Sequence, residues 1–151
     1  GTVDALVNHE MDLHVRTCAA QGVSEEALFN AEEEVANLAY TRFVLDAGLQ
    51  GDFLDMMAAL APCVMGYGEI GRRLGADGVA GTAYQDWIDT YAHADYQGLC
   101  DTVGAMIDAA VTRRLGSTPE RAPRWAQLQA RFTKATALEV GFWDMGLRPP
   151  A

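Results

Sequence analysis

Apolar residues recur in alternating steps of three and four along two long segments of this chain. Such spacing places each set of side chains on one face of an α-helix. Alternation with a period of two, which would indicate half-buried strands, is almost absent. The sequence therefore predicts an all-α protein, a helical bundle. The two sets are Phe53, Met56, Leu60, Cys63, Tyr67, Ile70 and Leu74, and Trp125, Leu128, Phe132, Ala135, Glu139 and Phe142.

Local signals divide the chain into about six helices and one short helical turn. Ser24 and Asp52 are suited to cap helix N-termini, and Gly22, Gly48 and Gly116 to end helices. The helix at 32–47 is apolar nearly all round, so we expect it to be central. The predicted ranges are 2–20, 24–29, 32–47, 53–74, a short aromatic helix near 84–91, 95–115, and 118–145.

Composition narrows the class of protein. With 151 residues, 50% of them hydrophobic, the chain can build one core, so we expect a single domain over residues 1–151. The formal charge of −10 comes from 21 acidic and 11 basic residues, and Lys and Arg form no run. This excludes a nucleic-acid partner, because phosphate backbones are bound by clustered basic residues. A small molecule is the expected partner.

Cysteine usage and hydropathy point to one compartment. Cys18, Cys63 and Cys100 are an odd number of widely spaced cysteines, which is typical neither of a disulfide framework nor of a zinc site. Gly, Pro and Glu interrupt every apolar stretch before about 18 residues, and no signal peptide is visible at the N-terminus. We expect a cytoplasmic protein with reduced thiols and no membrane partner.

Cys63 is the first candidate catalytic residue. It directly follows Pro62 inside a predicted helix, where a proline should kink the chain. A buried cysteine is more often a small hydrophobic residue than a nucleophile, but a kink inside a core costs stability unless it positions something. Tyr67 lies four residues on and can form a hydrogen bond beside the sulfur. Because no Lys or Arg is near Cys63 in sequence, we expect attack with proton transfer to a neighbouring group.

Glu139 is the second candidate, because a carboxylate occupies a position that its neighbours reserve for the core. Burial raises the pKa of such a group, which can then act as acid and base in turn. The alternative is a carboxylate held by tyrosines in a structural network. Tyr40 and Tyr91 are on the inward sides of their helices and offer a flat ring and a hydroxyl, although both also suit a core.

Glu10 and His14 have the four-residue spacing of metal ligands on a helix. A helical di-metal site needs several further carboxylate or histidine partners at matching depth, and Glu139 is the only one that we find. We expect no metal and no cofactor.

Four segments, taken in order and spacing, resemble the TenA family, the thiaminase II or aminopyrimidine aminohydrolase enzymes. They cover the chain almost end to end, and because a cysteine stands at position 63, the chain resembles the cysteine class. The resemblance implies the heme oxygenase-like helical fold. The segments are AYTRFVLDAGL (39–49), LAPCVMGYGEIGRRL (60–74), DWIDTYAHADYQ (86–97) and LEVGFWDMGL (138–147).

The resemblance also implies roles for individual residues. Cys63 would be the nucleophile that adds to the pyrimidine ring of aminomethylpyrimidine or thiamin, giving 4-amino-5-hydroxymethyl-2-methylpyrimidine. Glu139 would donate and accept a proton at the ring nitrogen. Tyr40 and Tyr91 would line the pyrimidine pocket and bond to the substrate or the thiol, and we expect Tyr67, beside the sulfur, to bind substrate as well. The family resemblance further suggests a homo-oligomer.

Members of the TenA family have further N-terminal helices, one of which carries an aspartate that grips the aminopyrimidine. No segment here matches it, so we expect this chain to correspond to the C-terminal two-thirds of the fold. Two other readings stay open. One is a pyrimidine-binding or regulatory protein without catalysis, and the other is a metal-dependent oxidase built on Glu10, His14 and Glu139.

Overall fold

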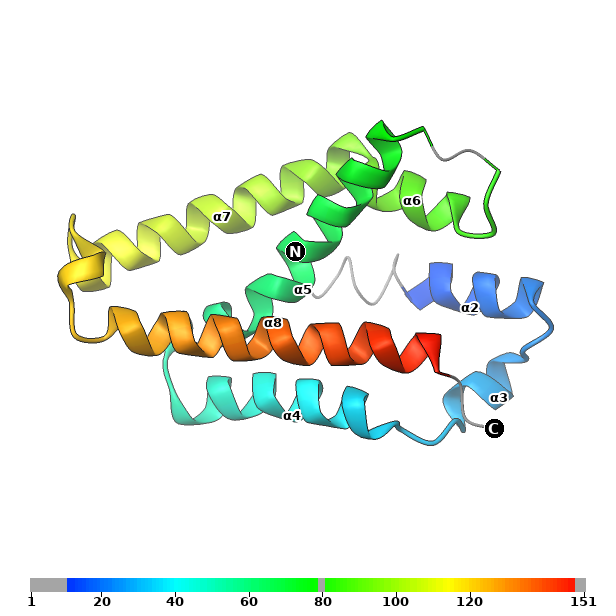
Figure 1. Ribbon diagram of the computed structural model, residues 1–151, viewed down its shortest axis with the longest axis horizontal. Coiled ribbons are helices and arrows are strands. Elements are labelled where there is room, and N and C mark those ends of the chain that lie inside the picture. The colour runs from blue at the N-terminus through cyan, green and yellow to red at the C-terminus, as the bar shows by residue number, and fades with distance from the viewer. Residues whose placement is uncertain (1–10, 79–80, 149–151) are drawn as a thin grey trace. The chain divides into compact units, whose positions relative to one another are not determined.

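The computed structural model describes residues 11–78 and 81–148 (Figure 1). Over these residues the chain forms helices and no strand, so the predicted all-α class is confirmed. The chain divides into two compact units, Gly1–Glu34 and Val35–Ala151. The expectation of one domain over residues 1–151 stays a prediction.

The first unit contains α2 (Met11–Ala20) and α3 (Glu25–Phe29). The chain leaves α2 at Gly22, whose φ of +82° favours glycine. The predicted cap of the next helix is confirmed, since the backbone N–H of Ala27 donates to the Ser24 hydroxyl over 3.1 Å. The part of the predicted 2–20 helix before Met11 lies outside the described residues.

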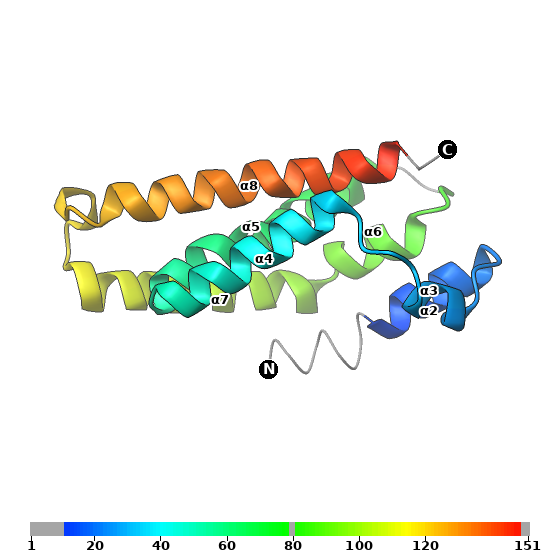
Figure 2. The same cartoon turned by 90° about the horizontal axis from the view of Figure 1, so that it is seen from below.

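The second unit is organised around one long helix, α5. This helix contacts four other helices of the unit, and Figures 1 and 2 show it running obliquely between the turn after α4 and α6. The unit consists of α4 (Val35–Gln50), α5 (Phe53–Ala76), α6 (Gln85–Ala92), α7 (Ala94–Leu115), the 3-10 helix η2 (Pro119–Arg121) and α8 (Trp125–Leu147).

The prediction that the 32–47 helix is central is therefore wrong. In α4 only Tyr40 and Ala47 are buried, while Leu45 and Leu49 are 56% and 85% exposed. In α5, by contrast, the buried side chains fall on several faces and include small ones such as Ala59. A pattern of large apolar residues misses such positions, because alanine and glycine are buried where neighbouring helices approach closely.

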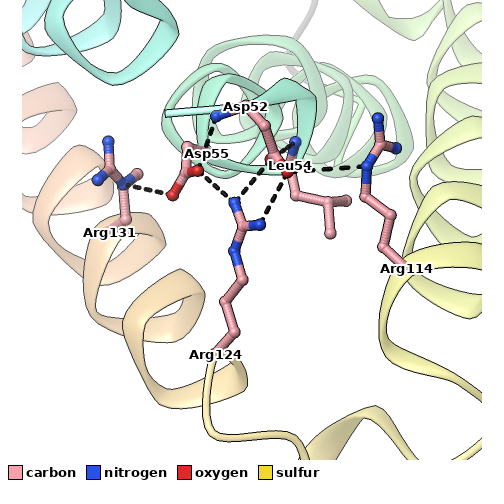
Figure 3. Close-up of polar contacts among 6 residues, drawn as sticks. All are labelled: Asp52, Leu54, Asp55, Arg114, Arg124 and Arg131. Carbon is pink, nitrogen blue, oxygen red and sulfur yellow. Dashed lines mark hydrogen bonds and ion pairs between the residues drawn. The ribbon is translucent and has the colours of Figure 1, made fainter. Parts of the chain in front are cut away.

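The N-terminus of α5 is fixed by a capping box and a cluster of charges (Figure 3). The N–H of Leu54 donates to Asp52 over 2.8 Å, and the N–H of Asp52 donates to Asp55 over 2.9 Å. Arg124, just before α8, donates to both carboxylates and reaches Asp52 through two bonds of 2.7 Å. The bidentate geometry connects the start of α5 to the start of α8.

Two other arginines complete this ion cluster, which we define as Asp52, Asp55, Arg114, Arg124 and Arg131. Arg131 of α8 lies 3.4 Å from the Asp55 carboxylate, and Arg114 of α7 lies 3.7 Å from that of Asp52. The carboxylate of Asp55 is largely buried, so its charge is compensated inside the protein. Three helices therefore meet at one compensated group of charges.

Several predicted helix boundaries are wrong; α4, for example, begins at Val35 and not at Glu32. The last helix begins at Trp125 and not at Thr118, because Pro123 lacks an N–H and the residue before it, Ala122, is extended. Gly48 does not end α4, which continues to Gln50. Gly116 does end α7, with a φ of +87°.

An apolar cleft of about 830 Å³ opens between α5, α7 and α8. Its walls include Met57, Ile107, Leu128 and Phe132, and none of the five candidate site residues lines it. By length and composition α5 could also cross a membrane. Its contacts with four helices are typical of the core helix of a bundle.

Candidate active site

Cys63, Glu139 and Tyr40 come together where α5, α8 and α4 meet. Tyr40 and Glu139 are each 7% exposed, and the half-buried Cys63 packs against the same group of residues. Small side chains allow the three helices to approach closely at this point. These small residues, all fully buried, are Ala47, Ala59 and Ala135.

The Tyr40 hydroxyl lies against the turn of α5 that carries Cys63. It donates to the carbonyl oxygen of Ala59 over 3.3 Å and accepts from the backbone N–H of Cys63. In a regular helix that N–H and that carbonyl would bond to each other. Pro62 lies in the same turn and has no N–H, so one hydrogen bond of the helix backbone is missing there. The Tyr40 hydroxyl bonds to backbone groups next to this missing bond. The predicted kink itself stays a prediction.

The carboxyl group of Glu139 faces both Cys63 and Tyr40. Burial raises the pKa of Glu139 above its ordinary value, while hydrogen bonds with the Tyr40 hydroxyl and the Cys63 thiol work in the opposite direction. Burial is the larger effect, because removing a carboxylate from water disfavours its charged form. The group can therefore both hold and release a proton.

Burial, followed by the nearby Cys63 and Glu139, raises the pKa of Tyr40 far above its ordinary value. Tyr40 therefore stays neutral and acts as a hydrogen-bond partner only. One carboxyl oxygen of Glu139, Oε2, is buried and has no hydrogen-bond partner among the described residues. A buried polar atom without a partner is costly and rare, so Oε2 is the atom most ready to bond to a ligand.

Tyr67 and Tyr91 lie in an aromatic cluster next to these groups. We define the cluster as Tyr67, Trp87, Tyr91, Tyr96 and Trp143. The ring of Tyr67 is 5.2 Å from that of Tyr91 and 5.4 Å from that of Trp143, measured between centroids. Tyr91 is only 1% exposed. Aromatic rings at such distances attract one another and fix each other's orientation.

This arrangement separates the candidate residues into two groups. Cys63, Glu139 and Tyr40 form a polar group, and Tyr91 and Tyr67 belong to the aromatic cluster. Tyr67 follows Cys63 by one helical turn in α5, and Trp143 follows Glu139 by one turn in α8. The hydrogen bond expected between Tyr67 and the sulfur stays a prediction.

The sequence reasoning named no role for Trp87 or Trp143. Trp87 lies 4.5 Å from Tyr91 and 5.8 Å from Trp143, so it joins α6 to α8. The sequence does contain a signal that places both tryptophans near the candidate residues. Trp87 precedes Tyr91 by four residues, and Trp143 follows Glu139 by four. Residues at that spacing share a helix face.

The metal-site alternative stays a prediction, because Glu10 lies outside the described residues. His14 is on α2, in the first unit. Among the described residues no group of three or more His, Cys, Asp or Glu could hold a metal ion.

Several known proteins are similar to this chain. It is 35% identical over 145 residues to an aminopyrimidine aminohydrolase of Halalkalibacterium halodurans, covering 93% of this chain and 61% of that protein. It is 34% identical over 140 residues to an uncharacterized protein of Haemophilus influenzae, covering 91% of this chain and 62% of that protein. The chain thus spans about three-fifths of the length of these curated relatives.

Two solved structures share the fold. A TenA family transcription regulator of Silicibacter sp. TM1040 is 59% identical with a TM-score of 0.94, over 99% of this chain and 66% of that chain. A TenA homologue of P. horikoshii OT3 has a TM-score of 0.78 at 22% identity, over 94% of this chain and 63% of that chain. The profile of the TENA/THI-4/PQQC family matches residues 2–149. This chain belongs to the TENA/THI-4/PQQC family.

Proposed function

We propose that the protein is a hydrolase of thiamin salvage that converts aminomethylpyrimidine, or thiamin, to 4-amino-5-hydroxymethyl-2-methylpyrimidine. The observation that carries this proposal is the contact of Cys63 with the buried Glu139, whose Oε2 has no hydrogen-bond partner within the described part of the chain. A relative at 35% identity is named an aminopyrimidine aminohydrolase, which supports the same substrate class.

In the proposed reaction the sulfur of Cys63 bonds to a carbon of the pyrimidine ring while Glu139 donates a proton to a ring nitrogen, and the carboxylate that this leaves takes up the proton of the thiol. The electron pair of the ring then expels the group on the exocyclic methylene, which is ammonia in one substrate and the thiazole in the other. Water adds to the methylene carbon and releases one proton to the solvent. The C–S bond then breaks with its electron pair on sulfur, and the proton on the ring nitrogen returns through Glu139 to the thiolate, which restores the thiol and the protonated carboxyl group. A carboxyl group with a pKa raised by burial suits the first step, because burial favours the protonated form that donates, and its hydrogen bonds to Tyr40 and Cys63 favour the ionised form that accepts a proton.

The other residues would hold the substrate. The Tyr40 hydroxyl would keep the turn with Cys63 in position, since it bonds to the backbone on both sides of Pro62. Tyr91 and Tyr67 would offer ring faces to the pyrimidine. The acidic chain, with its net charge of −10, suits a cationic substrate such as thiamin.

Substitution of the two central residues tests the proposal. Cys63→Ser should lower kcat at least about a thousandfold, because a hydroxyl is a far weaker nucleophile than a thiol. Glu139→Gln should lower kcat by about a hundredfold or more, since the amide cannot exchange a proton. Both variants should keep the helical circular dichroism of the wild type.

Cys18→Ser is the matched control, because it makes the same substitution at a half-buried cysteine to which the proposed mechanism assigns no role. It should leave turnover unchanged. If Cys63→Ser keeps most of the activity, the cysteine mechanism is wrong.

A second candidate is a protein that binds a pyrimidine without turning it over. It is favoured by the name of the 59% identical relative, a transcription regulator. Calorimetry with the hydroxymethylpyrimidine product, next to a turnover assay, separates the two, because tight binding without turnover would support the second.

Two further expectations concern the cellular location and the oligomeric state of the protein. A reducing, cytoplasmic location is supported by the three cysteines, none of which forms a disulfide in the described residues. A homo-oligomer stays a prediction.

A further inference from the structure

Gln97, near the N-terminus of α7, joins three helices through one side-chain amide. Its Nε2 donates to the carbonyl oxygen of Tyr91 over 2.7 Å and to that of Gly68 over 2.9 Å. An amide nitrogen carries two hydrogens, so both are used. The side chain of α7 thereby connects the end of α6 to the middle of α5.

The position of Tyr91 explains why such a bond matters. Tyr91 is the second-last residue of α6, and the last carbonyl groups of a helix have no partner within it. The chain turns into an extended conformation at His93 immediately afterwards. Gln97 therefore acts as a cap for α6 from outside the helix. With eight residues, α6 is too short to be stable on its own and depends on such contacts.

The backbone of α6 also approaches α5 more closely there than a side chain would permit. A Cβ at Gly71 would lie 2.6 Å from the Cβ of Tyr91 and 2.7 Å from its carbonyl carbon. A Cβ at Gly75 would lie 3.0 Å from that of Ala92. Because Gly71 and Gly75 have no side chains, Tyr91 can pack closely against α5, and the amide of Gln97 keeps it in this position.

The ring of Tyr91 transmits this placement to the aromatic cluster. Its centroid lies 4.5 Å from that of Trp87 and 4.7 Å from that of Tyr96. Tyr96, next to Gln97 in sequence, is itself held to α5 by a hydrogen bond of 3.1 Å to the carbonyl oxygen of Val64. A shift at the end of α6 would therefore move the rings but not Cys63 and Glu139, which stand on α5 and α8.

We propose that Gln97 is a positioning residue for Tyr91, fixing the aromatic wall of the substrate site through its two amide hydrogen bonds. The proposal rests on the function proposed above, in which Tyr91 lines the pyrimidine pocket. It assigns Gln97 to substrate binding and not to the chemical step.

Gln97→Met tests the proposal, because methionine has a similar length but no hydrogen to donate. KM should rise roughly tenfold, the effect of two lost hydrogen bonds, while kcat stays within about twofold. If Gln97 only stabilised the fold, Gln97→Met would instead have a lower apparent kcat, because a smaller fraction of the protein would be folded, and its KM would be unchanged. The near-ultraviolet circular dichroism of the aromatic cluster should weaken together with the rise in KM.

Two further variants are matched controls. Gln97→Lys restores hydrogen-bond donors and should bring KM back to within about threefold of the wild type. Gln85→Met makes the same change within α6, at a side chain that bonds to Asp89 and the N–H of Gly81, and should leave KM unchanged.

The proposal is overturned if Gln97→Met has the KM of the wild type, if Gln97→Lys is as impaired as Gln97→Met, or if Gln85→Met raises KM as much. Should the wild-type protein neither bind nor turn over an aminopyrimidine, the proposed function fails instead. The near-ultraviolet spectrum then decides the role of Gln97. Loss of the aromatic signal in Gln97→Met and its return in Gln97→Lys support positioning of Tyr91, and a wild-type signal in Gln97→Met refutes it.

Discussion

At the scale of single residues, the properties of Glu139 depend on burial. The side chain is 7% exposed and its Oε2 has no partner in the described structure, so the protein has removed a carboxyl group from water without full compensation. Such a group is kept at a cost to stability. A functional site is where this cost is expected, because a ligand can supply the missing partner.

Replacing Glu139 by Gln should therefore stabilise the folded protein at neutral pH. Burial raises the pKa of Glu139 above the ordinary value of 4.5, so ionisation of this group disfavours the folded state. The penalty is absent below about pH 4.5, where both folded and unfolded chains are protonated, and it grows as the pH rises through the folded-state pKa. Thermal unfolding of both proteins from pH 4 to pH 8 measures the effect.

The difference in melting temperature, variant minus wild type, should be positive at pH 8 and shrink toward pH 4. Glu69→Gln is the control, because arginine side chains lower the pKa of that exposed carboxyl. The melting temperature of Glu69→Gln minus that of the wild type should not become positive as the pH rises. A Glu139→Gln curve parallel to the wild-type curve at all pH values would contradict a raised pKa.

At the scale of elements, α5 is distinguished by the use of its glycines. Gly68, Gly71 and Gly75 follow each other along the side that meets α6 and α7. Their lack of a side chain allows backbone contact with α6 and a sulfur contact with Cys100, 2.6 Å from a Cβ built at Gly68. At Gly66, in the same helix, no atom of the described residues lies within 4 Å of such a Cβ. Some glycines of α5 are thus required by packing, and one is not.

Gly71→Ala and Gly66→Ala should change stability in opposite directions. At position 71 the new Cβ would lie 2.9 Å or less from backbone and side-chain atoms of Tyr91, so α6 must move, at a cost of about 2 kcal/mol or more. At position 66 alanine should stabilise α5 by about 0.5–1 kcal/mol, because it favours the helix more than glycine does. Urea unfolding of the two variants measures both effects. Equal effects would show that the close approach of α6 to α5 does not constrain the fold.

At the scale of the second unit as a whole, the ion cluster connects elements that are distant in sequence. Arg124 lies before α8, Arg114 in α7, and the two aspartates at the start of α5. Hydrogen bonds from Arg124 hold the pKa of Asp52 below its ordinary value, and those bonds in turn raise the pKa of Arg124. Asp52 and Arg124 therefore each favour the ionised form of the other.

Arg124→Met should destabilise the protein by about 2 kcal/mol, because the buried carboxylate of Asp55 would keep only Arg131 as a positively charged partner among the described residues. A carboxyl group with a lowered folded-state pKa stabilises the protein above its unfolded pKa, and this contribution is lost as the pH falls through the folded-state value. Given the ordinary pKa of 3.8 for an aspartate, the difference in stability between wild type and variant should begin to narrow as the pH falls below about 4. Urea unfolding at pH 3, 5 and 7 checks this.

Arg121→Met, at an exposed arginine of η2, removes a charge outside the ion cluster and should leave stability within about 0.5 kcal/mol. A constant difference between Arg124→Met and the wild type across this pH range would exclude the charge of Asp52 as its origin.

Much of the helical layout was accessible from the sequence. The caps at Ser24 and Asp52 and the stop at Gly116 act through hydrogen bonds and backbone angles within a few residues, and all three are confirmed. The start of α8 was predicted wrongly because Pro119 has the features of a first helical residue. Pro123 disfavours a helical conformation at the residue before it, so α8 begins only after Pro123. The roles of the candidate site residues stay predictions. Periodicity placed Cys63 and Glu139 on inward faces, and the family resemblance supplied their chemistry.

By itself, then, the sequence determined the helical class and most helix ends, because these depend on contacts between residues close together in the chain. The tertiary structure alone decided that α5 and not α4 is central, and that Cys63 and Glu139, 76 positions apart, share one hydrogen-bonded cluster with Tyr40. It also decided that Gln97 reaches the end of α6. These arrangements depend on how closely helices pack, and that distance is set by small side chains such as Ala59 and Gly71, which no pattern of large apolar residues reveals.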